Sequence, residues 1–593
     1  MSLTRREMLI GGAAALGTVA AAPALSGCAT VSSSGRRRIR PTYDAVVIGS
    51  GFGGAVTACR LAQAGLSVAV LERGRRYDFS SFPRNWNNPY DGWLWSSGQG
   101  LFDVRLWGQE MTVVQSAGLG GGSLIYANVQ MRAPAAVFDR EWPSGYSRTA
   151  LDPYYDLVGY MLDVNPITRT TLPTKSQAMQ AAARTLGRAD QFCFPNIAVD
   201  LGPAGIEHQN KFGVTQRGCT SCGECCIGCN VHAKNTLDLN YLAIAGSLGA
   251  NIATMCEVFK IEAVDGGYKV SFKDHASDGQ INEISTRYCF VCAGAVNSTE
   301  LLLRCRDVHG TLDKLSPRLG DNYSGNGDFL SFAYNTDQPF NPSDGPTITT
   351  GVVYDRTDDG FKNWFIFEEG GYPRQVRTLM QLLNPRFGLL RTIGIATKNA
   401  LVDAFRALGG TAGPPDRGPD DTAVFLMMGR DLADGQLRLE PGSSELKIKW
   451  NVPPNLPLYE AERRLTEDFA NAMGGNAAMN PLWSLFRIPV TVHSLGGCLM
   501  ADSRNAGVTD ANGEVYGYPG LFVLDGAILP GATGVNPAHT IAAVSERNIE
   551  IAIRRFTGNP NWRAPETAFA KPINDPLASM TIPPGGTLPP EAR

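Results

Sequence analysis

The fold of this chain of 593 residues is decided by Val46-Val47-Ile48-Gly49-Ser50-Gly51-Phe52-Gly53-Gly54, a hydrophobic run that leads into G-x-G-x-x-G. The Val/Ile run over residues 43–49 predicts a buried parallel strand, and residues 54–65 predict the helix that follows it. Residues 66–71 predict a second apolar strand, which ends at Glu72. Strand, glycine turn, helix, strand and acidic residue together form the fingerprint of a dinucleotide-binding domain.

Each glycine of the fingerprint has a physical role. Gly49 permits a tight turn, Gly51 lets the backbone approach a pyrophosphate, and Gly54 allows the helix to pack closely on the strand. The first helical turn, which includes Phe52 and Gly53, offers free N–H groups that favour an anion. Glu72 is placed to accept hydrogen bonds from ribose hydroxyls.

Composition narrows the class of protein. The chain is 43% hydrophobic and 18% charged, which is ordinary for a globular protein, and its length predicts two or three core-bearing units. A formal net charge of −3 lacks the excess of positive charge that is typical of proteins that bind nucleic acid.

The first 40 residues read as a targeting segment rather than as part of the fold. Thr4-Arg5-Arg6-Glu7-Met8-Leu9 is a twin-arginine pattern, and a mildly apolar stretch follows it. The stretch ends in Leu25-Ser26-Gly27-Cys28, which resembles a bacterial lipobox. We therefore expect export to the periplasm or cell surface, with membrane attachment through a lipidated Cys28; a plain cleaved signal with a chance cysteine is the alternative.

Five further segments carry a family resemblance. They are Gly118-Leu119-Gly120-Gly121-Gly122-Ser123-Leu124, Ala293-Gly294-Ala295-Val296-Asn297-Ser298-Thr299-Glu300-Leu301-Leu302, His493-Ser494-Leu495-Gly496-Gly497-Cys498, Val523-Leu524-Asp525-Gly526 and Gly534-Val535-Asn536-Pro537. Together with the fingerprint, they resemble the glucose–methanol–choline (GMC) oxidoreductases, especially the cholesterol-oxidase-like branch. The likeness runs in the family's order from residue 43 to about residue 555.

The resemblance implies an α/β fold in which a Rossmann-like FAD-binding domain carries an antiparallel-sheet substrate-binding and cap domain. It implies FAD rather than a nicotinamide as cofactor. Beyond the fingerprint, the cofactor-binding residues it implies are Gly120, Gly121, Gly122, Ser123, Ala293, Gly294, Asp525, Gly526, Asn536 and Pro537. No histidine precedes His208, so a histidyl–flavin link from the amino-terminal half is not available, and we expect noncovalent FAD.

The domain boundaries expected on this basis interleave two units. The FAD-binding domain is built from three parts, 41–135, 241–335 and 490–556. A cap or linker segment with clustered cysteines occupies 136–240, and the substrate-binding domain occupies 336–489. The segments 1–40 and 557–593 are the targeting segment and a proline-rich tail.

The chemistry rests on the carboxy-terminal motifs. Oxidation of an alcohol moves a hydride to the flavin while the hydroxyl proton leaves, and an imidazole held against that hydroxyl is suited to take the proton. His493 matches the family's catalytic histidine and Asn536 matches its partner asparagine; Ser494 stands where cholesterol oxidases have proline. His539 has two interpretations, a second active-site imidazole or a histidine that contacts backbone near the start of a helix.

The cysteines add what the family outline lacks. Cys219, Cys222, Cys225 and Cys229 have the spacing C-x₂-C-x₂-C-x₃-C of bacterial ferredoxin ligands. An iron–sulfur cluster, with Cys226 or Cys193 as the candidates to complete its ligands, is one interpretation. Disulfides, natural in an exported protein, and a zinc site are the others.

The substrate is expected to be a sterol or another bulky hydrophobic alcohol, with O₂ or an electron-acceptor protein as the oxidant. Apolar residues 379–383 and a helix at 388–405 would line an entrance or pack as core. Glu368 and Glu369 fall where cholesterol oxidases have an isomerising glutamate, but the residues around them do not match, so that role is not assigned. The alternatives are a sugar or polyol dehydrogenase that sends electrons through a cluster to a cytochrome or quinone, and a flavin-dependent lyase or electron-transfer flavoprotein.

Overall fold

A computed structural model of the chain describes residues 39–85, 88, 91–108, 110–139, 141–167, 172–354, 363–374, 421–578 and 580. The chain divides into two units, Met1–Arg38 and Ile39–Arg593. The twin-arginine pattern and Cys28 lie outside the described residues, as do residues 379–383 and the helix expected at 388–405. In the described part of the chain, no helix is both long enough and apolar enough to cross a membrane.

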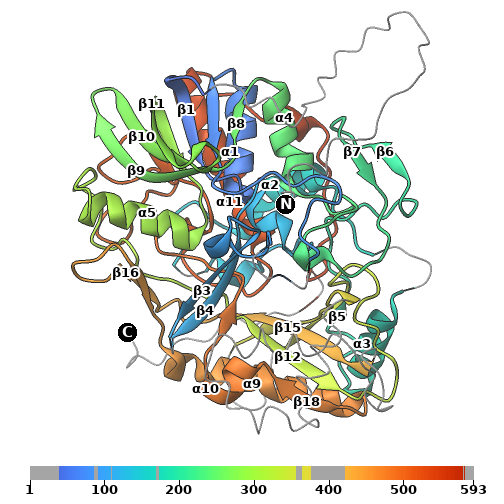
Figure 1. The fold of residues 1–593 in the computed structure, drawn as a ribbon. Helices are drawn as coiled ribbons and strands as arrows, with labels where there is room; N and C mark the ends of the chain where they lie inside the picture. Colours follow the sequence, from blue (N-terminus) through green and yellow to red (C-terminus); the bar gives the residue numbers. More distant parts are fainter. Residues whose placement is uncertain are drawn as a thin grey trace, which may run out of the picture. The chain divides into compact units, whose positions relative to one another are not determined.

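A mixed seven-stranded sheet forms the first layer of the second unit (Figure 1). Its parallel part contains β8 (Asn251–Ala253), β2 (Val68–Leu71), β1 (Thr42–Ile48), β11 (Gln280–Val291) and β20 (Leu521–Val523). The strands β10 (Gly267–Asp274) and β9 (Cys256–Val264) extend it with antiparallel pairing. This arrangement confirms the Rossmann-like part of the predicted fold.

The helix α1 (Phe52–Gln63) crosses from β1 to β2, so the predicted strand–helix–strand order is confirmed. The helix begins two residues earlier than expected because Gly51 is its N-cap. The other α-helices among the described residues are α2 (Arg148–Leu162), α3 (Thr174–Thr185), α4 (Tyr241–Ser247), α5 (Ala295–Asp307), α9 (Val452–Ala472), α10 (Pro481–Phe486) and α11 (Ala538–Thr557).

A buried ion pair joins the two ends of the FAD-binding fold. Arg60 of α1 donates to both carboxylate oxygens of Glu546 on α11, at 2.8 and 2.6 Å, and also to Glu566 at 2.5 Å. Breaking a buried pair of this kind costs about 3–5 kcal/mol, because it leaves an uncompensated charge in the interior. The pair therefore fixes α11, which directly follows Asn536, against the helix of the glycine fingerprint.

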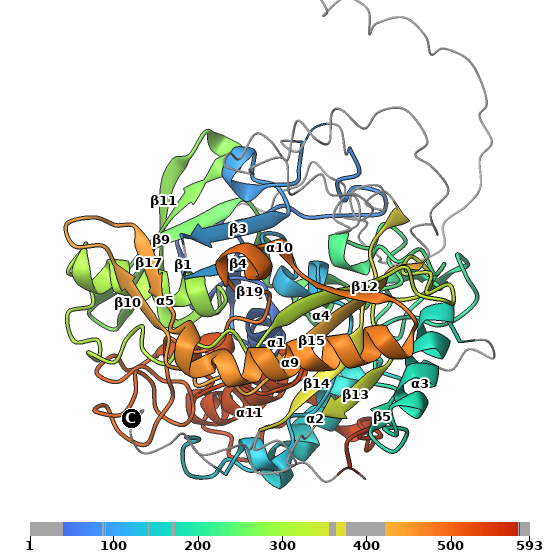
Figure 2. The same cartoon turned by 90° about the horizontal axis from the view of Figure 1, so that it is seen from below.

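The second layer is a six-stranded antiparallel sheet, which confirms the predicted substrate-domain architecture. The order is β18 (Asn476–Met479), β12 (Phe329–Tyr334), β15 (Ala423–Gly429), β14 (Phe365–Glu369), β13 (Gly351–Tyr354) and β5 (Phe192–Cys193). The long helix α9 lies along this sheet (Figure 2), and a cluster of aromatic residues that includes Phe367, Phe425 and Phe469 fills the space between them.

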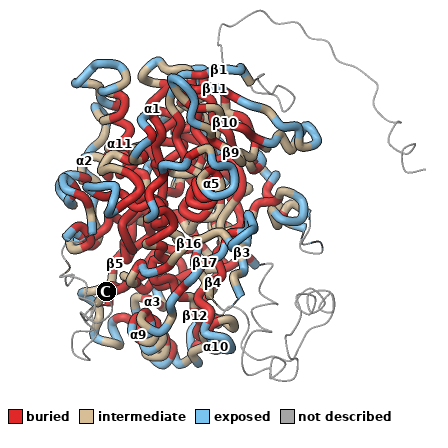
Figure 3. Tube along the Cα trace, turned by 90° about the vertical axis from the view of Figure 1, so that its left-hand side faces the viewer, coloured by how far each residue is buried: buried red, intermediate tan, exposed pale blue. Residues whose placement is uncertain are grey.

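Buried residues run through both large sheets (Figure 3). Small sheets complete the described part of the unit. They are β3 (Phe102–Trp107) with β4 (Met111–Ser116) and β19 (Val490–Thr491), β6 (Glu207–Gln209) with β7 (Thr215–Arg217), and β16 (Gln436–Leu439) with β17 (Leu446–Lys449). The pairing of β19 with β4 matters for the site because β19 ends two residues before His493.

Candidate active site

The two glycine-rich segments meet directly. A Cβ at Gly121 would lie 2.6 Å from the Cα of Gly51, so Gly121 leaves no room for a side chain at this contact. Gly49 has a φ of +94°, and a Cβ there would lie 2.4 Å from the carbonyl oxygen of Cys292. A Cβ at Gly54 would lie 2.2 Å from the carbonyl oxygen of Gly49, so this glycine permits the close helix–strand packing that the sequence indicated.

The backbone faces open space at Gly51, Gly122 and Gly294. A Cβ at Gly122 or Gly294 would have no protein atom within 4 Å, and one at Gly51 would meet only the Cα of Gly121, at 4.0 Å. Gly51 is also the N-cap of α1, whose first turn offers unpaired N–H groups. A bare backbone beside a helix N-terminus suits a pyrophosphate, so these residues fit FAD.

Glu72 lies at the end of β2, as predicted, but its carboxylate already binds protein groups. One oxygen accepts from the N–H and hydroxyl of Ser50, at 3.1 and 2.6 Å, and the other accepts from the N–H of Gly74 at 2.8 Å. The Ser50 hydroxyl in turn accepts from the N–H of Gly120 at 3.0 Å. Glu72 therefore ties both glycine segments together, and its contact with a ribose stays a prediction.

Asp525 joins two of the predicted cofactor segments. One carboxylate oxygen accepts from the N–H of Gly294 at 2.8 Å and from the hydroxyl of Ser298 at 2.5 Å, and the other accepts from the N–H of Ala527 at 2.8 Å. Burial raises the pKa of Asp525, and these donors act in the opposite direction. The Ala293–Gly294 turn is thereby fixed beside Gly526.

His493 is held by a buried carboxylate that the sequence did not indicate. Its Nδ1 lies 2.8 Å from Asp328 Oδ1, and Asp328 Oδ2 accepts from the Thr491 hydroxyl at 2.9 Å and the Val492 N–H at 2.8 Å. The Asp328 side chain is 1% exposed, whereas that of His493 is 16% exposed. A carboxylate at Nδ1 selects the tautomer with the proton on Nδ1, so Nε2 keeps its lone pair and is able to accept a proton.

Asn536 contacts a second buried carboxyl group, that of Glu368 on β14. The Asn536 amide donates to Glu368 Oε2 at 3.2 Å, and within the described structure neither Asn536 Oδ1 nor Glu368 Oε1 has a hydrogen-bond partner. Burial raises the pKa of Glu368 from 4.5 to about 8, so the carboxyl group is largely protonated at neutral pH. Two buried polar atoms with no protein partner fit the polar edge of a cofactor or a substrate hydroxyl.

The neighbouring Glu369 faces the other way, because successive residues of a strand alternate between its two faces. Its carboxylate binds the N–H and hydroxyl groups of Thr349 and Thr350 and lies 3.9 Å from the ammonium of Lys175. The two consecutive glutamates therefore have different partners. Glu368 contacts Asn536, and Glu369 lies beside the buried ammonium group of Lys175.

One short segment holds the His493 and Asn536 turns. The side chain of Asn326 donates to the carbonyl of Val535 at 2.9 Å and accepts from the N–H groups of Thr533 and Gly534. Two residues later, Asp328 binds His493. No motif marked this segment, and the only signal in the sequence is a polar, glycine-containing run just before a buried strand.

For His539 the structure supports the contact with backbone rather than a second active-site base. The ring is fully buried, and its Nε2 donates to the carbonyl of Tyr155 on α2 at 2.9 Å. Burial lowers the pKa of His539 to about 4, so the ring is neutral at physiological pH. Although His539 is only three residues past Asn536, it packs against α2, whereas Asn536 contacts the sheet.

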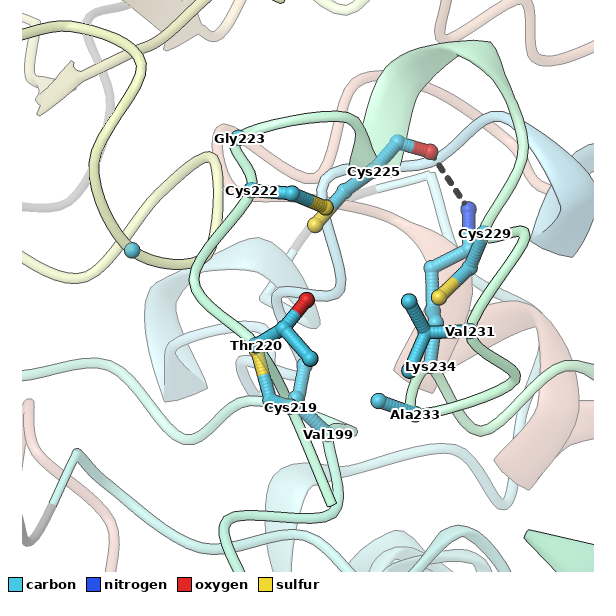
Figure 4. A pocket seen from close by; sticks show the side chains of 11 residues that line it. Val199, Cys219, Thr220, Cys222, Gly223, Cys225, Cys229, Val231, Ala233 and Lys234 are labelled. Atoms are coloured by element: carbon cyan, nitrogen blue, oxygen red, sulfur yellow. Dashed lines mark hydrogen bonds between the residues drawn. The ribbon is translucent and has the colours of Figure 1, made fainter. Parts of the chain in front are cut away.

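The four predicted cysteine ligands line one pocket (Figure 4). Cys219, Cys222, Cys225 and Cys229 surround it together with Lys234 and small or aliphatic residues, whereas Cys226 and Cys193 are not among its lining residues. Cys222, Cys225 and Cys229 carry free thiols. Among the described residues, no group of three or more His, Cys, Asp or Glu side chains is placed to hold a metal ion.

Comparison with known proteins agrees with this geometry. The amino-terminal and carboxy-terminal descriptions of the GMC oxidoreductase family match residues 8–307 and 463–545. The chain is similar to a cholesterol oxidase of Acinetobacter baumannii, with 28% identity over 586 residues that cover 91% of this chain and 98% of that protein. It is 30% identical over 546 residues to a cholesterol oxidase of Mycobacterium tuberculosis (strain CDC 1551 / Oshkosh), covering 86% and 91% of the two chains.

The fold is also similar to that of a solved FAD-dependent oxidoreductase from Chaetomium thermophilum. The TM-score is 0.58 at 15% identity, over 87% of this chain and 100% of that one. The family matches leave residues 308–462 between them, which contain most of the substrate sheet, whereas the similarity to the two cholesterol oxidases extends over most of the chain. The chain belongs to the GMC oxidoreductase family and is an FAD-dependent oxidoreductase that acts on the CH–OH group of alcohols.

Proposed function

We propose that the enzyme oxidises a sterol or another bulky hydrophobic alcohol, with His493 as the base that takes the hydroxyl proton. The observation that carries this proposal is the contact of His493 Nδ1 with Asp328 at 2.8 Å, which leaves Nε2 as the proton acceptor. Proton transfer to a positioned base contributes about 10²–10⁴-fold to rate. Bound FAD supplies the hydride acceptor for the carbinol hydrogen.

The protein's own groups position the hydroxyl. Asn536 Oδ1 is available to accept a hydrogen bond, and its amide is held by Glu368. Asn536 and Pro537 directly precede the 20-residue helix α11, whose N-terminus favours negative charge in the site. The Gly51, Gly121 and Gly294 backbone and Asp525 would hold noncovalent FAD.

The apolar side chains next to Glu368 on the substrate sheet support a hydrophobic substrate. In the sheet register Glu368 pairs with Leu426, which pairs in turn with Leu330, so the three side chains share one face. Both leucines are partly exposed, unlike the fully buried Glu368. Apolar surface beside a hydroxyl-binding set suits a bulky apolar alcohol better than a sugar. The similarity to two cholesterol oxidases over most of the chain supports the same class.

Anaerobic mixing of the enzyme with candidate alcohols tests the substrate class. We expect cholesterol and long-chain alcohols to bleach the flavin absorbance, and glucose and polyols to leave it unchanged. Bleaching by glucose or polyols alone would favour the sugar or polyol dehydrogenase. No bleaching by any alcohol would favour a lyase or an electron-transfer flavoprotein.

A second activity is favoured by one observation, the protonated and buried Glu368 beside Asn536. A carboxyl group with a pKa of about 8 is able both to donate and to accept a proton near neutral pH. We propose that it moves a proton in the oxidised product and so shifts a double bond into conjugation. Glu368→Gln is expected to leave flavin reduction intact and to release the unconjugated ketone; release of the conjugated ketone at the normal rate would contradict this role.

We also propose export by the twin-arginine route, with lipidation of Cys28. The support is the Arg5-Arg6 pair and the sequence Leu25-Ser26-Gly27-Cys28. Cys28→Ser is expected to release the protein from membranes, and Arg5→Lys with Arg6→Lys to keep it in the cytoplasm. Unchanged fractionation of both variants would contradict the proposal.

A further inference from the structure

Two amide side chains just after the second glycine-rich segment have no protein partner. Asn128 and Gln130 are fully buried, and within the part of the chain that the structure describes neither the oxygen nor the nitrogen of either amide makes a hydrogen bond. Buried polar atoms in folded proteins are almost always hydrogen-bonded, because an unmet donor or acceptor is costly. Two such amides, two positions apart, indicate a bound partner other than protein.

The backbone of the same two residues is firmly held. The carbonyl of Asn128 accepts from the N–H of Ala198 at 2.8 Å, and the N–H of Gln130 donates to the carbonyl of Asn196 at 2.8 Å. Asn128 has a φ of +71°, a left-handed conformation that asparagine adopts more readily than most residues. The main chain therefore fixes where both side chains start, and the amide groups themselves remain available to a ligand.

The segment that carries the amides runs between two helix starts of the cofactor site. At one end, the ring of Tyr126 packs edge-on against Phe52 in the first turn of α1, with ring centroids 5.6 Å apart. At the other end, the backbone of Gln130 lies beside the ring of His539 in the first turn of α11. The first helix follows the glycine fingerprint and the second follows Asn536, so the amides belong to the cofactor region rather than to a remote core.

A buried lysine fixes the turn that leads into this segment. Lys234 is 1% exposed, and its ammonium donates to the carbonyls of Leu124 and Tyr126, at 2.8 and 3.3 Å, and to that of Cys225 at 2.7 Å (Figure 4). The N–H of Tyr126 also donates to the carbonyl of Gly122 at 3.0 Å. Groups that are held in place before a ligand binds lose little entropy on binding, so the turn favours a ligand-binding role for the amides beyond it.

The chemistry of a carboxamide matches one part of FAD. Each amide has an oxygen that accepts and a nitrogen that donates. The imide edge of the flavin ring presents an N–H group between two carbonyl oxygens, so it uses both kinds of amide atom. The pyrophosphate only accepts hydrogen bonds, and the dimethylbenzene end of the ring is apolar, so neither of these parts would satisfy both atoms of an amide.

We propose that the amides of Asn128 and Gln130 hydrogen-bond the imide edge of bound flavin and thereby raise both its affinity and its reduction potential. The amide donors stabilise negative charge on the flavin carbonyl oxygens, and this charge increases when the ring is reduced. The inference goes beyond the oxidation of an alcohol, because it concerns the cofactor alone. Neither the identity of the substrate nor the role of His493 bears on it.

The variants Asn128→Gly and Gln130→Met remove one amide each with little other change. Glycine adopts a positive φ without strain, and the flexible methionine side chain has nearly the size of glutamine. In the holoenzyme we expect each variant to bind FAD about tenfold more weakly or worse, measured from the fluorescence of FAD released on dilution. We also expect a lower flavin reduction potential, measured against a reference dye during slow anaerobic reduction with no alcohol present.

Matched controls separate loss of an amide from loss of stability. Asn341→Gly repeats the first change at another asparagine with a positive φ, +56°. Gln63→Met repeats the second at a glutamine whose amide is bonded within the protein, accepting from Arg60 at 2.8 Å and donating to Glu566 at 2.7 Å. We expect both controls to keep the wild-type flavin affinity and potential, and Gln63→Met to lower the melting temperature.

A vibrational spectrum reads the proposed hydrogen bonds directly. The carbonyl stretching bands of flavin fall in frequency when the oxygen atoms accept hydrogen bonds. We therefore expect these bands to move to higher frequency in Raman spectra of Asn128→Gly and Gln130→Met holoenzyme, and to stay at the wild-type position in both controls. If Asn128→Gly is not recovered as folded protein, Gln130→Met carries the test alone.

Two results would overturn the proposal. Unchanged carbonyl bands, affinity and potential in Asn128→Gly and Gln130→Met would mean that the amides bind ordered water only. Unchanged flavin properties together with a raised KM for the alcohol would assign the amides to the substrate instead.

Discussion

Asp328 Oδ1 lies 2.8 Å from His493 Nδ1, so this buried carboxylate binds one nitrogen of the ring and leaves Nε2 as the proposed proton acceptor. The two residues are 165 positions apart in sequence. The contact joins β12 of the substrate sheet to the motif that follows β19, since Asp328 immediately precedes Phe329, the first residue of β12.

Asp328→Asn is expected to lower kcat by at least about tenfold, within the ~10²–10⁴ that a positioned base contributes, because an amide no longer selects the Nδ1–H tautomer. KM and flavin content should stay near wild type, since Asp328 positions His493 rather than binding substrate. Steady-state kinetics with cholesterol measure both. The exposed Asp307→Asn is the control, and a rise in KM at unchanged kcat would argue against the positioning role.

Glu368→Gln is expected to change the pH dependence of stability. The folded-state pKa of about 8 exceeds the ordinary 4.5, so unfolding releases a proton between these values and wild-type stability falls as pH rises through this window. The slope for one proton is at most about 1.4 kcal/mol per pH unit. Thermal unfolding at pH 5 and pH 8 should show a smaller loss in the variant than in the wild type; the exposed Glu207→Gln should behave like the wild type.

His539→Asn is expected to affect stability and not catalysis. The change removes the hydrogen bond from Nε2 to the buried Tyr155 carbonyl, and an unsatisfied buried acceptor costs about 1–3 kcal/mol. The melting temperature should fall while kcat stays within a few-fold of wild type. A loss of kcat comparable to that of a His493 variant, at unchanged melting temperature, would restore His539 as a catalytic residue.

Gly121→Ala is expected to yield protein with little flavin. The added Cβ would lie 2.6 Å from the Cα of Gly51, so the two cofactor segments must separate. Gly266→Ala is the matched control, because Gly266 also has a positive φ, +77°, but open space around it. The flavin-to-protein ratio of the two purified variants makes the comparison, and equal ratios would show that the close approach of the glycines does not matter.

Local patterns predicted the fold well. The strand–helix–strand of β1, α1 and β2 was predicted to within a few residues because its signals, apolar Val/Ile runs and glycine spacing, lie within one short window. The convergence of four cysteines was also predictable, since their spacing alone brings them together.

The site itself depended on long-range contacts that the sequence does not mark. Asp328 meets His493 only through tertiary structure, and Glu368 differs from Glu369 only in the face of the strand it occupies. The role of His539 depended on which neighbour it met, Tyr155 on α2 or the active site. Strand register and helix packing, not residue type, decided each of these.

The most direct test of the account is the rate of flavin reduction in His493→Ala, measured by anaerobic stopped flow with a 3-hydroxysteroid at saturation. With flavin content unchanged, the rate constant is expected to fall by about 10²–10⁴-fold relative to wild type. Reduction at the wild-type rate would contradict His493 as the base and, with it, the proposed mechanism.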